Sequence, residues 1–153
     1  MMSRDTLAST IVLLCRLVVG GVFIYASLDK LQHPGGFAQV IHNYRMVPYS
    51  LLNGLAYLLP VTEMLVGVAL ILGILRRGAA LLSGLMLVIF IVGITTALIR
   101  GLDISCGCFN TDGGHEVGLS LLLRDALLLV MCLPPLLYKQ SGPGLARLFN
   151  RSN

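Results

Sequence analysis

Residues 78–99 read GAALLSGLMLVIFIVGITTALI, a run without a single charged residue. A helix needs about 20 residues to cross a hydrocarbon core, and this run is long enough. Three further apolar runs occupy residues 7–28, 51–75 and 117–138. A spanning backbone must satisfy its own hydrogen bonds, and these runs are too long and too uniformly apolar for barrel strands. The sequence therefore predicts an all-α integral membrane protein, a four-helix transmembrane bundle.

The composition of the whole chain agrees with this class. Of its 153 residues, 56% are hydrophobic and 12% are charged, whereas a soluble protein carries about 25% charged residues. The net charge of +4 comes from scarce acids without a basic block, which argues against nucleic-acid binding. We expect one transmembrane domain over residues 1–153. The first run carries Arg16 and has no small-x-small cleavage site before Asp29, so we expect it to be retained.

The distribution of Lys and Arg predicts the orientation, because cytoplasmic connections are enriched in these residues. One side of the predicted bundle carries Arg4, Arg76, Arg77, Lys139, Arg147 and Arg151, and the other carries Lys30, Arg45 and Arg100. We therefore expect a bacterial inner-membrane protein with both termini in the cytoplasm. Residues 139–153 would form a cytoplasmic tail, and the two longer connections would lie outside.

The first outer connection carries an apolar stripe, Phe37, Val40, Ile41 and Tyr44, with helical spacing. It predicts a short interfacial helix over residues 35–47, with Tyr44 as an anchor in the interface. For Lys30, which precedes this helix, two roles remain open. It is either a snorkelling anchor or a cation that favours the thiolate form of a nearby cysteine.

The second outer connection, residues 101–116, contains the sequence Ser105-Cys106-Gly107-Cys108-Phe109. Two cysteines separated by one residue can join only in a small strained ring, and strained disulfides belong to the easily reduced, catalytic type. Two alternatives remain, a metal site with His115 as the nearest further ligand and an inert pair of loop cysteines. We expect Cys106 and Cys108 to be redox-active and to bind no metal.

Ionisable residues within the spans should face the bundle interior and find partners there. Arg16 and Glu63 both lie about 18 Å from the outer ends of their runs, which predicts a buried ion pair between them. Arg124 and Asp125 lie higher, about 11 Å from the outer end. Neighbouring residues of a helix point about 100° apart, so we expect these two to have separate partners.

The role of the buried charges is open on the sequence alone. They could fix the register of the helices, or line a polar cavity suited to a quinone head group or a proton path. Cys15 and Cys132 also lie within spans at similar depth. Buried thiols are mostly inert, and the alternative is a second thiol pair that relays electrons.

Several short motifs together resemble a known family. They are residues 21–31, GVFIYASLDKL, followed by His33-Pro34; LPVTE at 59–63 with Gly67; CGCF at 106–109; and LRD at 123–125. This combination is similar to the DoxX-like membrane proteins and, within them, to the redox-associated MauE branch. The resemblance implies a four-helix membrane protein that supports disulfide formation or maturation of an exported amine dehydrogenase, alongside a thioredoxin-like protein.

The favoured interpretation is a membrane thiol–disulfide redox protein. Cys106 and Cys108 would exchange electrons with a thioredoxin-like, rhodanese-like or exported dehydrogenase partner, and a membrane quinone is the candidate cofactor. The alternative is a non-catalytic membrane anchor or assembly subunit of a soluble oxidoreductase or sulfurtransferase. The sequence leaves open whether the chain is itself an enzyme, which pathway it serves and whether it forms a homo-oligomer.

Overall fold

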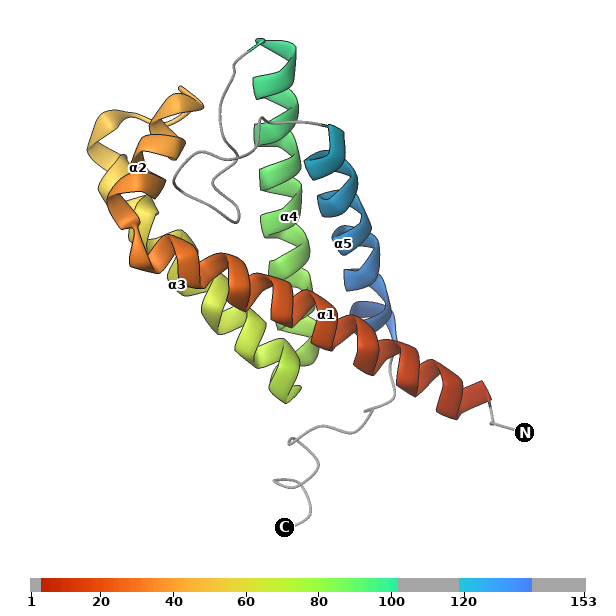
Figure 1. Cartoon of the computed structure of the whole chain (residues 1–153). Coiled ribbons are helices and arrows are strands. Elements are labelled where there is room, and N and C mark those ends of the chain that lie inside the picture. The colour runs from red at the N-terminus through yellow and green to blue at the C-terminus, as the bar shows by residue number, and fades with distance from the viewer. Residues whose placement is uncertain (1–3, 102–118, 139–153) are drawn as a thin grey trace.

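The computed structural model describes residues 4–101 and 119–138. Within these ranges the chain forms helices and no strand (Figure 1). The helices are α1 (Arg4–Gln32), α2 (Pro34–Asn43), α3 (Tyr49–Leu72), α4 (Arg76–Ile99) and α5 (Leu119–Leu137). The cysteines of the second connection, Cys106 and Cys108, and the tail 139–153 lie outside the described residues.

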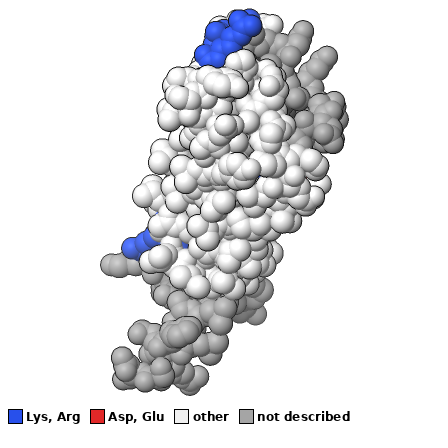
Figure 2. All heavy atoms as spheres, turned by 90° about the vertical axis from the view of Figure 1, so that its left-hand side faces the viewer, with Lys and Arg blue, Asp and Glu red and all other residues white. Residues whose placement is uncertain are grey.

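The predicted all-α fold is confirmed. Four helices, α1, α3, α4 and α5, are long and apolar enough to cross a membrane. Figure 2 shows one face of the molecule, on which Lys and Arg appear only towards the two ends and no acidic residue is visible. Between these ends the visible face carries no Lys, Arg, Asp or Glu, as expected for a surface in contact with lipid.

The helix bounds differ from the predicted spans in ways that matter for the site. The first helix continues to Gln32, four residues beyond the predicted end, so Lys30 belongs to a spanning helix. The interfacial helix α2 is shorter than predicted because the backbone turns after Tyr44, where Arg45 has a φ of 51°. Its buried face, Phe37, Val40 and Ile41, packs on the first half of α3.

Helix α1 runs obliquely across the bundle, while α4 and α5 lie side by side (Figure 1). Its closest approach is to α3, at Gly20 and Gly67. A Cβ added to either glycine would lie 2.8 Å from the backbone oxygen of the other. Only the absence of both side chains lets the two backbones meet at this point, as is common where spanning helices cross.

The turn between α3 and α4 is tight. Gly73 ends α3 in the left-handed conformation, with a φ of 75°, and its amide bonds back to the carbonyls of the last turn. Leu75 is also left-handed, and α4 begins directly after it at Arg76. Arg76 and Arg77 therefore lie in the first turn of α4 rather than in the connection.

We predict that Gly67→Ala lowers the free energy of unfolding by about 1–3 kcal/mol, because its methyl group would separate α1 from α3. Thermal unfolding in detergent micelles measures the change. Gly54→Ala on the same helix is the control, since a Cβ there meets nothing within 4 Å. The close-approach interpretation is wrong if the two variants are equally stable.

Candidate functional site

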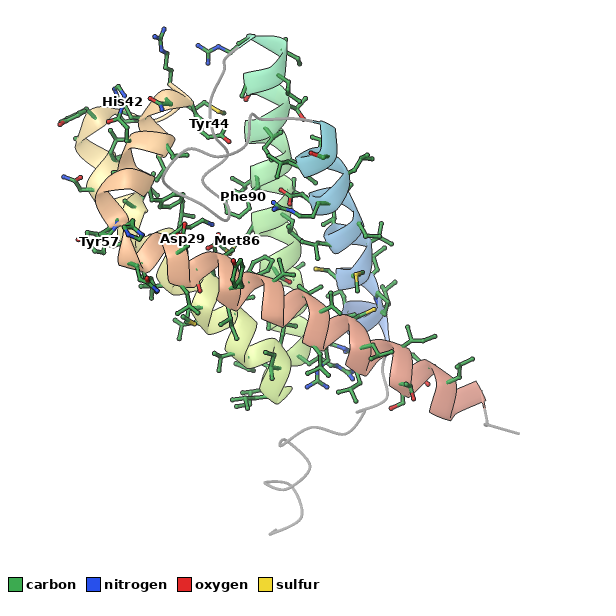
Figure 3. The ribbon with its side chains drawn as sticks, in the orientation of Figure 1. Asp29, His42, Tyr44, Tyr57, Met86 and Phe90 are labelled. Atoms are coloured by element: carbon green, nitrogen blue, oxygen red, sulfur yellow. The ribbon has the colours of Figure 1, made fainter. Side chains whose placement is uncertain are left out.

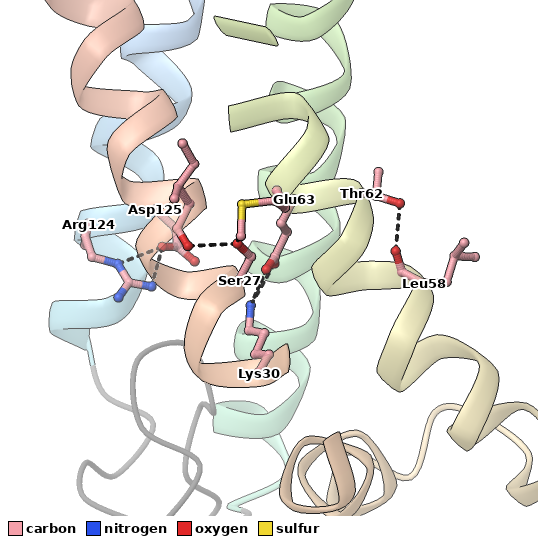
Figure 4. A network of polar contacts seen from close by, with 9 residues as sticks. Ser27, Lys30, Leu58, Thr62, Glu63, Arg124 and Asp125 are labelled. Carbon is pink, nitrogen blue, oxygen red and sulfur yellow. Dashed lines mark hydrogen bonds and ion pairs between the residues drawn. The ribbon is translucent and has the colours of Figure 1, made fainter. Parts of the chain in front are cut away.

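The central feature of the bundle is an ion pair between α1 and α3. Lys30 donates hydrogen bonds to both carboxylate oxygens of Glu63, with Nζ–Oε1 and Nζ–Oε2 distances of 2.7 and 2.9 Å. Both residues are almost completely buried, at 1% and 2% exposed. The bidentate contact, seen in Figure 4, compensates part of the desolvation of two charges.

Aromatic rings surround the Lys30 ammonium. Its Nζ lies 5.1 Å from the centre of the Phe37 ring on α2 and 5.2 Å from that of Phe90 on α4. Both distances are within the range in which a cation is attracted to a π face. One lysine thus contacts α2, α3 and α4 from its position on α1.

The predicted ion pair between Arg16 and Glu63 is wrong. Arg16 instead donates to two carbonyls at the end of α3, from Nε to Leu70 O at 2.8 Å and from Nη2 to Ile71 O at 3.2 Å. These are carbonyls that a helix C-terminus leaves without partners, and a cation is favourable there. A Cβ on Gly73 would collide with the Arg16 guanidinium, so the turn glycine makes room for this contact.

Depths counted from the predicted ends of the spans do not give the true pairing, because α1 is longer than predicted and tilted. With a first span that ends at residue 28, Lys30 would lie at the membrane interface. The longer, oblique α1 instead brings Lys30 to the level of Glu63 (Figure 4). The interpretation of Lys30 as a snorkelling anchor is therefore also wrong, because its ammonium is inside the bundle.

Arg124 and Asp125, expected to have separate partners, bind each other. The Nε and Nη2 atoms of Arg124 donate to Asp125 Oδ1 at 2.9 and 2.7 Å. The Cβ directions of adjacent residues do diverge, but the long arginine side chain bends back across the turn. Asp125 is 2% exposed, and its Oδ2 accepts no hydrogen bond from the residues described.

The two ion pairs line one small cavity. Lys30, Glu63, Arg124 and Asp125 share its wall with apolar residues of α1, α4 and α5, among them Phe90, whose position on α4 Figure 3 shows. Its volume is about 30 Å³. A cavity that binds benzene measures about 150 Å³, so a quinone ring does not fit here. Of the two roles left open by the sequence, register and a polar cavity, the second thus has a counterpart only in a cavity large enough for one or two water molecules.

Tyr44 lies between α2 and α4, as Figure 3 shows. A Cβ added to Gly93 on α4 would lie 3.7 Å from the Tyr44 ring. The ring packs on Ile94 and Ala97 of α4, as does Leu121 of α5. The backbone oxygen of Tyr44 also accepts a hydrogen bond of 3.4 Å from Arg100. The ends of α2 and α4 and the start of α5 therefore meet at one end of the bundle, which we call the connection end.

The buried cysteines Cys15 and Cys132 are free thiols. The Sγ of Cys132 lies 3.4 Å from the hydroxyl oxygen of Ser83 on α4. Within the described ranges, no three His, Cys, Asp or Glu side chains come close enough to hold a metal ion.

These features define a class, a helical membrane protein in which a buried ion pair joins two of the spans. Comparison with known families is more specific. Residues 8–138 match the family described as "Methylamine utilisation protein MauE", and the chain belongs to this family. The MauE resemblance found in the sequence is thereby confirmed.

Individual relatives carry the same name, "Methylamine utilization protein MauE". The protein from Paracoccus denitrificans is 32% identical over 119 residues, which cover 77% of this chain and 64% of that protein. The protein from Methylophilus methylotrophus is 30% identical over 126 residues, covering 81% and 66%. The chain thus spans less than two thirds of the length of these relatives. No solved structure matches it significantly.

We predict that Lys30→Met and Glu63→Leu each destabilise the protein by about 3–5 kcal/mol, because each leaves a buried charge without its partner. The double variant should lose much less than the sum of the two single losses. Unfolding free energies in detergent measure this coupling.

The matched control is a second cycle, with Arg16→Met in place of Lys30→Met. Arg16 binds carbonyls rather than Glu63, so its loss and the Glu63→Leu loss should add to within about 0.5 kcal/mol. Strong coupling of Arg16 to Glu63, with none for Lys30, would contradict the observed pairing.

Proposed function

We propose that this protein is a membrane thiol–disulfide exchange protein and that Cys106 and Cys108 are its reactive pair. The observation that carries the proposal is the Cys-Gly-Cys sequence in the connection between two spans of a MauE-family protein. A disulfide closed by so few atoms is strained, and strain makes a disulfide a better oxidant of other thiols.

The chemistry is a balanced exchange. A thiolate of the partner attacks one sulfur of the Cys106–Cys108 disulfide, which forms a mixed disulfide and releases the other cysteine as a thiolate. The second thiol of the partner then displaces the first cysteine. The partner is oxidised to a disulfide, and Cys106 and Cys108 are left as a dithiol. A membrane quinone could accept the two electrons and two protons needed to restore the disulfide, at a site other than the 30 Å³ cavity.

The fold supports exchange on one side of the membrane. Helix α4 ends and α5 begins at the connection end, where Tyr44 and Leu121 of α5 both pack on Ile94 and Ala97 of α4. At the opposite end Arg76, which starts α4, donates to the Tyr138 carbonyl after α5 at 2.7 Å. The connection that carries the cysteines therefore starts and ends at the end of the bundle opposite Arg76. The excess of Lys and Arg at the Arg76 end favours a cytoplasmic location for that end, and thus an extracytoplasmic location for the cysteines.

The name of the relatives suggests the physiological setting. We propose that the partner is an exported thioredoxin-like protein or dehydrogenase, and that the exchange serves the maturation of an amine-oxidising enzyme. A rhodanese-like partner would place the same chemistry in sulfur handling. Identification of the captured partner distinguishes these settings.

We predict that Cys106→Ser or Cys108→Ser traps the mixed disulfide when the partner is oxidised. The remaining thiolate attacks the partner's disulfide, forming a mixed disulfide and releasing one partner thiolate, while the second thiol of this chain that would complete the exchange is missing. Both variants are made in a chain with Cys15→Ala and Cys132→Ala, which removes the buried thiols. Non-reducing gels after acid quenching and alkylation detect the adduct.

The variant without any cysteine is the control and should form no adduct. If neither single variant captures a partner and the cysteine-free chain supports full function, the exchange proposal fails. Co-purification of a soluble oxidoreductase with that cysteine-free chain would instead support the role of a membrane anchor.

We further predict that a membrane-impermeant maleimide labels Cys106 and Cys108 in intact cells after reduction, because the cysteines lie outside the cytoplasm. A cysteine introduced by Arg77→Cys, at the exposed start of α4, is the control and should react only after the cells are opened. The reverse pattern would overturn the orientation and leave the pair in a reducing compartment.

A further inference from the structure

We propose that an ordered water molecule binds between α1, α3 and α5 and joins Asp125 to the Lys30–Glu63 ion pair. The site is the cavity of about 30 Å³ that these residues line. This inference rests on the charge cluster alone and does not depend on the function proposed for Cys106 and Cys108.

The acceptor is Asp125 Oδ2. Asp125 is 2% exposed, and while its Oδ1 accepts two hydrogen bonds from Arg124, its Oδ2 accepts none from the residues described. A buried carboxylate oxygen without a donor is costly, and such atoms in folded proteins are commonly satisfied by bound water. A water molecule beside Asp125 Oδ2 would donate the hydrogen bond that this oxygen lacks.

The donor is Lys30. An ammonium group has three N–H bonds, and Glu63 accepts two hydrogen bonds from it, one on each carboxylate oxygen. The third N–H is available to a water molecule in the cavity that Lys30 lines. A water that accepts from Lys30 and donates to Asp125 has the polar partners that a buried water requires.

Size and charge select water over other ligands. A water molecule needs about 10–15 Å³ of such space, so 30 Å³ holds one or two waters and no organic ring. The two cations, Lys30 and Arg124, are balanced by two carboxylates, Glu63 and Asp125. Counted over the described residues, the cluster has no net charge, so a small neutral molecule fits it better than an ion.

Such a water would connect ion pairs that are otherwise separate. Lys30 and Glu63 join α1 to α3, whereas Arg124 and Asp125 are neighbours on α5. The bridge would extend the polar network to a third spanning helix. Figure 4 shows the two ion pairs that the water would connect.

Radiolytic footprinting tests the proposal, because hydroxyl radicals formed from bound water oxidise the side chains beside it. Leu87 on α4 lines the cavity, whereas Leu52 lies near the start of α3 and does not, although they are 3% and 4% exposed. In the unchanged protein in detergent micelles we expect Leu87 to be oxidised several-fold faster than Leu52. Equal rates at the two leucines would overturn the proposal.

Three variants connect the oxidation rate to the site. Asp125→Leu removes the acceptor and should lower the Leu87 rate to that of Leu52, whereas Asp125→Asn keeps an acceptor oxygen and should retain fast oxidation. Ala26→Leu, which fills the cavity from α1, should also abolish the difference without changing a charged residue. A Leu87 rate that stays high in both Asp125→Leu and Ala26→Leu would show that the water lies elsewhere.

Discussion

The ion pair between Lys30 and Glu63 is the constraint on which the arrangement of the spans depends. A charge inside a bilayer is costly unless an opposite charge and hydrogen bonds surround it. Lys30 obtains both only if the end of α1 reaches the middle of α3, and this requires α1 to be long and oblique. The aromatic rings on α2 and α4 then pack around the ammonium. One electrostatic requirement thus sets the position of α1 against three other helices.

Two further contacts fix the same interface between α1 and α3. Gly20 and Gly67 allow the backbones to touch near its centre, and Arg16 binds the last carbonyls of α3 beyond it. Sliding one helix past the other would break all three contacts together. Packing, a helix-end contact and an ion pair therefore specify one register, whereas apolar packing in lipid discriminates weakly between alternatives because lipid tails are as apolar as the helices.

The sequence predicts the helices well and their pairing poorly. Length and hydropathy suffice for the four spans, since the bilayer dictates both. The buried stripe of α1 is also visible, because Phe23, Ala26, Ser27 and Lys30 follow helical spacing and all four are buried. That spacing was the signal that Lys30 faces the interior. Which charge it meets depends on the tilt of α1, which no local pattern encodes, and the bend of Arg124 towards Asp125 is equally a matter of side-chain conformation.

The sequence leaves two roles open for the buried charges, a reactive centre and a support for the helices, and their surroundings in the structure favour the second. The buried charges could have formed the reactive centre, but they neutralise one another around a cavity of about 30 Å³, which is too small for a redox cofactor. Neither buried cysteine lines that cavity. Electron exchange with a protein partner requires an accessible group, which the interior of this bundle does not offer. We therefore propose that the charge cluster holds the helices in place, and that the chemistry belongs to the connection between α4 and α5.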